Sequence, residues 1–159
     1  MQTELSTLEV LKTAKEYAER FTGDTRRPVG AAIVTFDPYR LVFGTNFYPD
    51  PDKASETKEH IRHAEVDVLL TAKTYGFDLG QSILYVTKAP CLDCAKMMVA
   101  AGVDTVVMAS PDPSSRWYES QLEGVKYLRD HKVAVDRATA LGDIIRDFEQ
   151  FESEQSGAR

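Results

Sequence analysis

The sequence predicts an α/β protein in which a mixed five-stranded sheet lies between two layers of helices, with its last two strands parallel. Three observations predict this three-layer α/β/α sandwich. Short apolar runs rich in β-branched residues alternate with segments of helical periodicity. The first two strands are separated by a short turn, which indicates an antiparallel hairpin. The last two strands are joined through a helix, and that connection suits a parallel crossover.

The N-terminal part is expected to form a helix and then the hairpin. Ser6-Thr7-Leu8-Glu9 has the pattern of a capping box that opens a helix. Residues 29–36 and 41–46 read as strands on either side of the turn signal Asp37-Pro38. The helix should place on the core the apolar residues that recur at helical spacing: Leu8, Leu11, Ala14, Ala18 and Phe21.

The middle of the chain is expected to add two helices with a strand between them. After a proline-containing loop at residues 48–56, a helix should run from about residue 60 to residue 75. Residues 83–87 read as a short buried strand. Pro90 suits the first turn of a helix that ends at residue 101, and Gly102 is its expected C-cap.

The C-terminal part completes the predicted sheet. Residues 105–109 and 133–135 read as strands, and residues 118–130 read as the helix between them. We expect one domain over residues 1–152, followed by a polar tail at residues 153–159. A last amphipathic helix is marked by Leu141, Ile144, Ile145, Phe148 and Phe151.

Composition and charge favour a globular protein that acts on a small molecule. The chain has 159 residues and a net charge of −6. Its longest basic run is Arg26-Arg27, which weighs against nucleic acid as a partner because that binding depends on clustered cations. No apolar segment is long enough for a membrane span, and no signal peptide pattern opens the sequence. We therefore predict no membrane partner. Because two cysteines suit a reducing cytosol better than a secreted disulfide scaffold, we also predict a cytoplasmic protein.

Two short segments carry the chemistry: His63-Ala64-Glu65 and Pro90-Cys91-Leu92-Asp93-Cys94. Cys91 and Cys94 are three residues apart at the start of a predicted helix, so they share one face and can hold one ion. With His63 they make a set of three good zinc ligands. Three protein ligands leave one position open, where zinc activates water. The segments therefore predict a hydrolytic site with zinc as cofactor.

Two other interpretations of the cysteine pair stay open. A C-x-x-C pair can be a redox motif, although the preceding proline and the distant His63-Ala64-Glu65 favour a metal. The three ligands could also belong to a structural zinc site with a fourth ligand, for which His60 and His131 are candidates. Glu65 weighs against this second interpretation, because a structural site does not need that carboxylate.

The two segments match H-x-E…P-C-x-x-C, the signature of zinc-dependent nucleobase deaminases. Over residues 28–136 the chain resembles the cytidine deaminase superfamily, and residues 85–96, YVTKAPCLDCAK, are most similar to its deoxycytidylate deaminase branch. The resemblance implies a cytidine deaminase-like fold. It also implies that Glu65 is the catalytic proton shuttle, which takes a proton from water, delivers it to the ring nitrogen and then protonates the departing amine.

The resemblance implies further residues that contact the substrate. Asn46 would contact the sugar or base, and the backbone of Ala64 would face the amino-bearing edge of the ring. Trp117 or Tyr118 could stack on a base, and Arg116 could meet a phosphate. Two plainer interpretations stay open: Asn46 as a turn-former after a strand, and Trp117 as a core or interface residue.

The expected function is the zinc-dependent hydrolytic deamination of an amino-pyrimidine, with a dCMP- or CMP-like mononucleotide as the leading substrate. The alternative is a deaminase of a free nucleobase or nucleoside such as cytosine, cytidine or guanine. A tRNA adenosine deaminase fits less well, because residues 85–96 are less like that branch. A non-catalytic zinc-stabilised binding module is the alternative outside enzymes. The resemblance also implies a homo-oligomer.

Two segments depart from the deoxycytidylate deaminase pattern. That branch usually follows its His-Ala-Glu with one residue and then Asn-Ala, whereas this chain has Val66-Asp67-Val68. Many members carry a Gly-Tyr-Asn-Gly segment tied to feedback by deoxycytidine triphosphate, and here the segment is Gly44-Thr45-Asn46-Phe47. The resemblance therefore leaves feedback regulation open.

Overall fold

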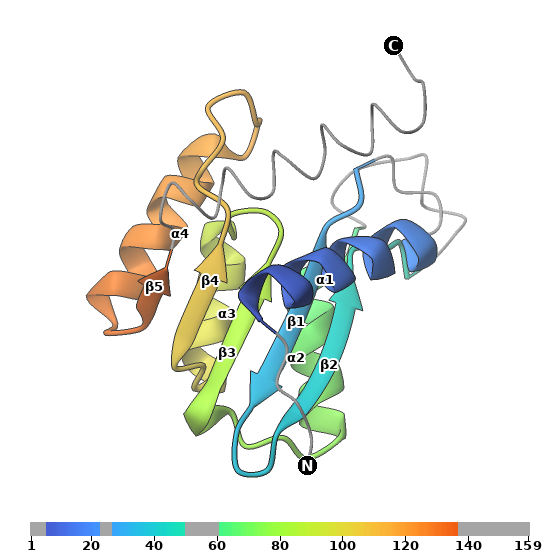
Figure 1. Ribbon diagram of the computed structural model, residues 1–159. Coiled ribbons are helices and arrows are strands. Elements are labelled where there is room, and N and C mark those ends of the chain that lie inside the picture. Colours follow the sequence, from blue (N-terminus) through green and yellow to red (C-terminus); the bar gives the residue numbers. More distant parts are fainter. Residues whose placement is uncertain (1–5, 23–26, 50–60, 137–159) are drawn as a thin grey trace.

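The computed structural model describes residues 6–22, 27–49 and 61–136, which contain a five-stranded mixed sheet (Figure 1). The strand order is β2-β1-β3-β4-β5. β1 pairs antiparallel with β2 and β3, whereas β3, β4 and β5 are parallel, which confirms the predicted hairpin and crossover. The strands are β1 (Gly30–Thr35), β2 (Arg40–Thr45), β3 (Ser82–Val86), β4 (Thr105–Met108) and β5 (Ala134–Asp136).

Helices cover both faces of the sheet, so the predicted three-layer sandwich is confirmed. The helices among the described residues are α1 (Thr7–Phe21), α2 (Ala64–Thr74), α3 (Leu92–Ala101) and α4 (Tyr118–Asp130), with a short 3-10 turn, η3 (Leu79–Gln81), before β3. Side chains alternate between the two faces of a strand. In β1, Ala32 and Val34 accordingly pack with α1, while Ala31 and Ile33 belong to the core cluster on the other face, which contains residues of α2, α3 and α4.

The first helix begins where the capping box predicts. Ser6 Oγ accepts a hydrogen bond from the Glu9 N–H at 3.2 Å, and Glu9 Oε1 accepts one from the Ser6 N–H at 3.3 Å. The prediction that Leu8 and Phe21 face the core is wrong, since they are 41% and 54% exposed. Phe21 packs on Tyr17 instead, with ring centroids 4.7 Å apart. The buried stripe consists of Val10, Leu11, Ala14 and Ala18.

Two helix starts lie later in the sequence than predicted, and both bear on the site. Helix α2 begins at Ala64 because Arg62 is held extended by backbone hydrogen bonds of 2.7 and 3.0 Å with Phe47. Helix α3 begins at Leu92 with Cys91 as its N-cap, so Pro90 precedes the helix. Helix α4 has the predicted bounds, the other element ends lie within two residues of the prediction, and Gly102 is the predicted C-cap, with φ of 84°.

Several predictions concern residues outside those described. The amphipathic helix around residues 141–151, the tail at residues 153–159 and the domain boundary at residue 152 therefore stay predictions. Among the helices of residues 6–22, 27–49 and 61–136, none combines the length and apolar character needed to cross a membrane. The cytoplasmic location also stays a prediction.

Candidate active site

The two motif segments meet where α2 and α3 begin. His63 is the N-cap of α2, Cys91 is the N-cap of α3, and Cys94 lies one turn into α3. His63 Nδ1 lies 3.3 Å from Cys94 Sγ and 3.6 Å from Cys91 Sγ. All three ligand atoms lie within 4.8 Å of one another. The structure therefore brings together the three residues predicted to hold a metal.

This geometry fits a tetrahedral zinc ion. Bond lengths of about 2.0 Å to nitrogen and about 2.3 Å to sulfur place two tetrahedral ligands about 3.5 Å apart. The two nitrogen–sulfur distances lie on either side of that value. Of the two candidate fourth ligands, His131 stacks on Tyr127 at the end of α4, at 3.9 Å between ring centroids, so it is not part of the cluster. His60 lies outside the described residues.

The electrostatics of the cluster favour a soft anionic donor set. A hydrogen bond from the Cys94 thiol, together with His63, lowers the pKa of Cys91 to about 4. The same hydrogen bond raises the pKa of Cys94, and the hydrogen bond with Cys91 raises the pKa of His63. A thiolate is the form of cysteine that binds a metal, and zinc accepts thiolate and imidazole ligands together.

Glu65 is buried beside these ligands. It is the second residue of α2 and is only 5% exposed. Burial raises the pKa of this carboxyl group, and the nearby His63 lowers it. Because His63 is an extended N-cap residue, with φ of −73° and ψ of 153°, the two side chains do not have to point to opposite sides as they would in a regular helix. A buried carboxyl group with a raised pKa is suited to accept and return a proton near neutral pH.

Close contact between β2 and α2 holds this helix start in place. A Cβ atom on Gly44 would lie 2.7 Å from the backbone nitrogen of Val68, so only glycine permits the approach. The Thr45 N–H donates to Asp67 Oδ2 at 3.0 Å. Asp67 occupies the position where the deoxycytidylate deaminase pattern has Asn. In this chain its carboxylate accepts the hydrogen bond that connects β2 to α2.

Trp117 and Arg116 lie next to the candidate metal ligands. The Trp117 ring meets the His63 ring edge-on, with centroids 5.5 Å apart and an angle of 82° between the ring planes. The Arg116 guanidinium carbon lies 4.7 Å from the centre of the indole ring. Ser115 Oγ accepts a hydrogen bond from the Trp117 N–H at 3.0 Å and fixes the turn. Tyr118 begins α4 and is half-buried, and its contact with a substrate stays a prediction.

The side chain of Asn46 forms hydrogen bonds with other residues of the chain. Its Oδ1 accepts hydrogen bonds from the Val29 N–H and the Thr22 hydroxyl, both at 3.0 Å. Its Nδ2 donates to the Arg27 carbonyl oxygen at 2.9 Å. Ala64, the first residue of α2, is fully buried. The predicted contacts of Asn46 and of the Ala64 backbone with a substrate stay predictions.

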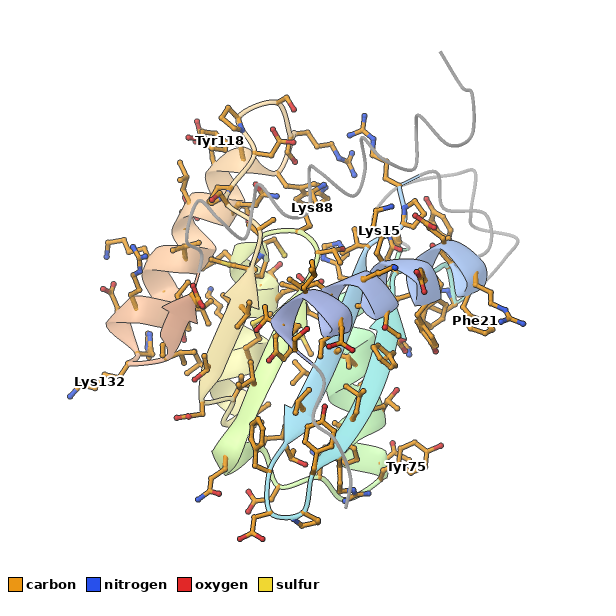
Figure 2. All side chains as sticks on the ribbon, in the orientation of Figure 1. Lys15, Phe21, Tyr75, Lys88, Tyr118 and Lys132 are labelled. Atoms are coloured by element: carbon orange, nitrogen blue, oxygen red, sulfur yellow. The ribbon has the colours of Figure 1, made fainter. Side chains whose placement is uncertain are left out.

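A half-buried lysine near the cluster was not identified from the sequence as a site residue. Lys88 follows the carboxyl end of β3 (Figure 2). Burial lowers the pKa of its ammonium group, as do Arg27 and Arg116, while Asp112 and Glu65 raise it. These charges therefore lie around Lys88. Its position, two residues before the Pro90 of the ligand segment, was the signal available in the sequence.

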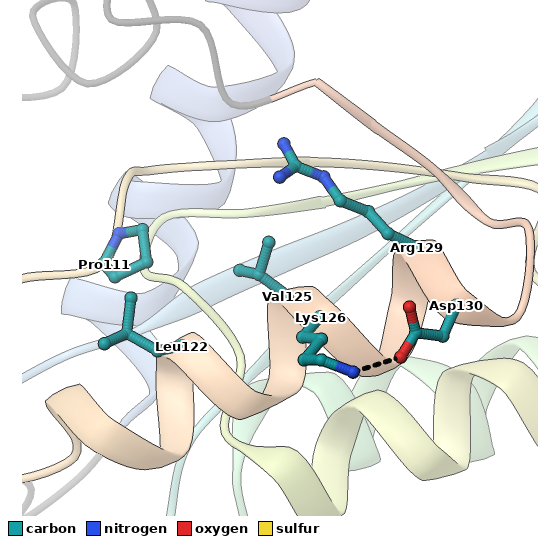
Figure 3. Close-up of a pocket in the computed structure, with 6 residues that line it drawn as sticks. All are labelled: Pro111, Leu122, Val125, Lys126, Arg129 and Asp130. Atoms are coloured by element: carbon teal, nitrogen blue, oxygen red, sulfur yellow. Dashed lines mark hydrogen bonds and ion pairs between the residues drawn. The ribbon is translucent and has the colours of Figure 1, made fainter.

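A pocket of about 220 Å³ on α4 is a poor candidate for the reaction (Figure 3). None of its lining residues belongs to the two motif segments, and an exposed ion pair of 2.6 Å between Lys126 and Asp130 lies in its wall. The pocket is lined by Pro111, Leu122, Val125, Lys126, Arg129 and Asp130.

Comparison with known proteins identifies the family. Residues 5–110 match the family model described as the cytidine and deoxycytidylate deaminase zinc-binding region. The chain belongs to the cytidine and deoxycytidylate deaminase family. It is therefore a deaminase, a hydrolase acting on C–N bonds, which confirms the predicted enzyme class.

Several relatives of this deaminase carry related names. It is 31% identical to a probable deoxycytidylate deaminase of Drosophila melanogaster, over 82% of this chain and 71% of that protein. It is 34% identical to a deoxycytidylate deaminase of Mycobacterium phage D29, over 58% of this chain and 70% of that protein. The crystal structure of the dCMP deaminase from cyanophage S-TIM5 in complex with dCMP and dUMP aligns with a TM-score of 0.64 and 25% identity, over 80% of this chain and 92% of that one.

Proposed function

We propose that this deaminase holds zinc with His63, Cys91 and Cys94 and hydrolyses the amino group of a pyrimidine mononucleotide such as dCMP. The observation that carries the proposal is the cluster of three ligand atoms within 4.8 Å of one another, with the buried carboxyl group of Glu65 beside it. The names of the relatives support deoxycytidylate as the substrate.

Glu65 would move both protons of the attacking water. When bound, zinc lowers the pKa of a coordinated water from about 15.7 toward about 7 and so supplies a nucleophile near neutral pH. Glu65 accepts the first proton and delivers it to the ring nitrogen beside the amino-bearing carbon. It then passes the second proton to the amino group. The C–N bond breaks, ammonia leaves, and the carbon keeps the water oxygen as a carbonyl.

The surrounding side chains favour a base with a phosphate attached. Trp117 offers an aromatic surface beside His63, on which a pyrimidine can stack. Lys88, Arg27 and Arg116 contribute positive charge near this surface, and a phosphate monoester carries a charge of about −1.5 to −2 at pH 7. Together they support a mononucleotide over a nucleoside.

Three more of the predicted contacts belong to the same proposal. Tyr118 and the backbone of Ala64 would complete the walls of the site. Asn46 would act mainly by fixing the segment that contains Arg27, whose carbonyl oxygen it binds. In this arrangement the side chain of Asn46 positions a cation for the phosphate, and its contact with the sugar is secondary.

The direct test is ammonia release from a panel of substrates by the purified zinc-loaded protein. The panel contains deoxycytidylate, cytidylate, deoxycytidine, cytidine, cytosine and guanine. We expect the highest kcat/KM for a mononucleotide. Glu65→Gln should lower kcat by about 10²–10⁴-fold, the usual contribution of a general acid–base group, and should still bind one zinc per chain. Glu16→Gln, an exposed change on the opposite side of the sheet, is the matched control.

Three outcomes would overturn this proposal. Faster deamination of a free nucleoside or nucleobase would assign the alternative substrate class. Tight zinc binding without ammonia release from any of the six compounds would point to a zinc-stabilised binding module. A protein that binds no zinc but deaminates deoxycytidylate would remove the proposed role of the three ligands.

A further inference from the structure

The backbone between the two cysteine ligands is held by a side chain from another helix. The Leu92 N–H, the first of α3, donates a hydrogen bond to Ser120 Oγ on α4 at 2.9 Å. The first N–H groups of a helix have no acceptor within that helix, and an N-cap side chain usually supplies one. Cys91, the N-cap of α3, makes no such hydrogen bond with its side chain. Ser120 therefore supplies from α4 an acceptor for the first of these N–H groups.

A glycine one turn later on α4 allows this contact. Ser120 and Gly124 are four residues apart, so they lie on the same face of the helix. A Cβ atom on Gly124 would lie 2.7 Å from the carbonyl oxygen of Pro90 and 3.1 Å from the carbonyl carbon and oxygen of Cys91. The backbone of α4 thus rests directly on the ligand segment, and any side chain at residue 124 would push the two apart.

Helix α4 also holds the loop that ends at Trp117. Gln121 is 1% exposed, and its Oε1 accepts a hydrogen bond from the Asp112 N–H at 3.0 Å. Trp117, at the end of that loop, lies against His63. One side of α4 is therefore connected to the cysteine ligands and, through Trp117, to the histidine ligand. Movement of α4 relative to α3 would change the spacing of all three.

We propose that Ser120 is a positioning residue for the metal centre, and that its hydrogen bond to the Leu92 amide, made possible by Gly124, sets the zinc affinity. This inference rests on the proposed zinc site. Leu92 lies between Cys91 and Cys94, so a shift of its amide moves both sulfur atoms relative to His63, which belongs to a different helix. A ligand pair that must first be repositioned binds the ion less tightly.

The test measures zinc affinity by competition with a chromogenic chelator, independently of catalysis. Ser120→Ala should weaken zinc binding about 10-fold or more, the usual effect of losing a group that orients a ligand. Ser120→Thr, which keeps a hydroxyl group, should restore most of the affinity. Gly124→Ala should weaken binding as well. With cobalt in place of zinc, Ser120→Ala should alter the thiolate charge-transfer band.

A matched control separates positioning from general loss of stability. Ser82 is 1% exposed, and its hydroxyl donates to the Leu79 carbonyl oxygen at 2.7 Å at the start of β3. Ser82→Ala likewise removes a hydroxyl group from a part-buried hydrogen bond, but it should leave zinc affinity unchanged. If Ser120→Ala binds zinc as tightly as the parent, or if Ser82→Ala weakens binding equally, the positioning role is refuted. Failure of the parent itself to bind zinc would instead refute the proposed function.

Discussion

Replacing Lys88 with Met should lower activity on mononucleotides without lowering stability. The ammonium group is half-buried, and burial together with Arg27 lowers its pKa. The charged form is therefore disfavoured in the folded protein until an anion binds. Methionine keeps much of the apolar stem that lysine packs against its surroundings. We expect the melting temperature of Lys88→Met to equal or exceed that of the parent.

The pH dependence of this stability difference has a defined sign. Because the folded-state pKa of Lys88 lies below the unfolded-state value, the native state is penalised while the side chain is charged in both states. The penalty disappears as the pH rises through the folded-state pKa toward the ordinary lysine value. Lys88→Met has no such penalty, so its advantage over the parent should shrink as the pH rises through that window.

The catalytic effect is larger and depends on the substrate. A hydrogen bond to a charged group contributes about 1.5–3 kcal/mol, and we take the lower end because Lys88 is only half-buried. Since about 1.4 kcal/mol corresponds to a factor of ten, kcat/KM for deoxycytidylate should fall about 10-fold. Deamination of deoxycytidine should be unchanged.

The assay compares ammonia release from deoxycytidylate and deoxycytidine by the parent, Lys88→Met and Lys73→Met. Lys73 is an exposed lysine in the last turn of α2, so its substitution is a control for the loss of one positive charge. An equal loss of kcat/KM on both substrates would refute a role in binding phosphate. A fall in the melting temperature of Lys88→Met would show instead that Lys88 stabilises the fold.

Three further substitutions test individual contacts. Gly44→Ala should lower the free energy of unfolding by about 1–3 kcal/mol in urea titrations, because the added methyl group meets the Val68 backbone at 2.7 Å. Asn46→Ala should lower the same quantity by about 1–3 kcal/mol, because the Val29 N–H and the Arg27 carbonyl oxygen lose a partner. Cys91→Ser should stabilise the chelator-treated protein by about 0.5–1 kcal/mol, because serine is a preferred N-cap. It should also abolish the stabilisation of about 2.7 kcal/mol that zinc at 100 times its Kd gives the parent.

Much of the fold could be predicted because local patterns and long-range packing agree. The Ser6 capping box, the apolar run of β1 and the Gly102 C-cap each appear where the sequence places them. The parallel pairing of β4 and β5 followed from the helix between them. The three candidate metal ligands, which the structure brings together, were predicted because their residue types and spacing are rare outside metal sites.

What could not be predicted depends on contacts between distant parts of the chain. The start of α2 is set by the pairing of Arg62 with Phe47, and no hydrophobic periodicity reports that pairing. The partners Thr22, Arg27 and Val29 of Asn46, which lie 17 to 24 residues away, are equally invisible in a local pattern. Ser120 and Gly124 read from the sequence as ordinary helix residues, since their contact with the Leu92 segment exists only after α3 and α4 pack together.

Two of the proposed metal ligands occupy positions that helix capping would otherwise use. His63 and Cys91 are both N-caps, and neither makes a side-chain capping hydrogen bond, although Ser, Thr, Asp and Asn are preferred there. An N-cap side chain that binds a metal does not accept a hydrogen bond from the first turn of its helix. Another element then has to stabilise that helix start. Ser120 on α4 supports the start of α3, and Asp67 ties the first turn of α2 to Thr45 at the end of β2. The neighbouring elements therefore have to hold both helix starts in position. This requirement accounts for the close approach of α4 to the segment before α3 at Gly124, and of β2 to α2 at Gly44, where only glycine fits.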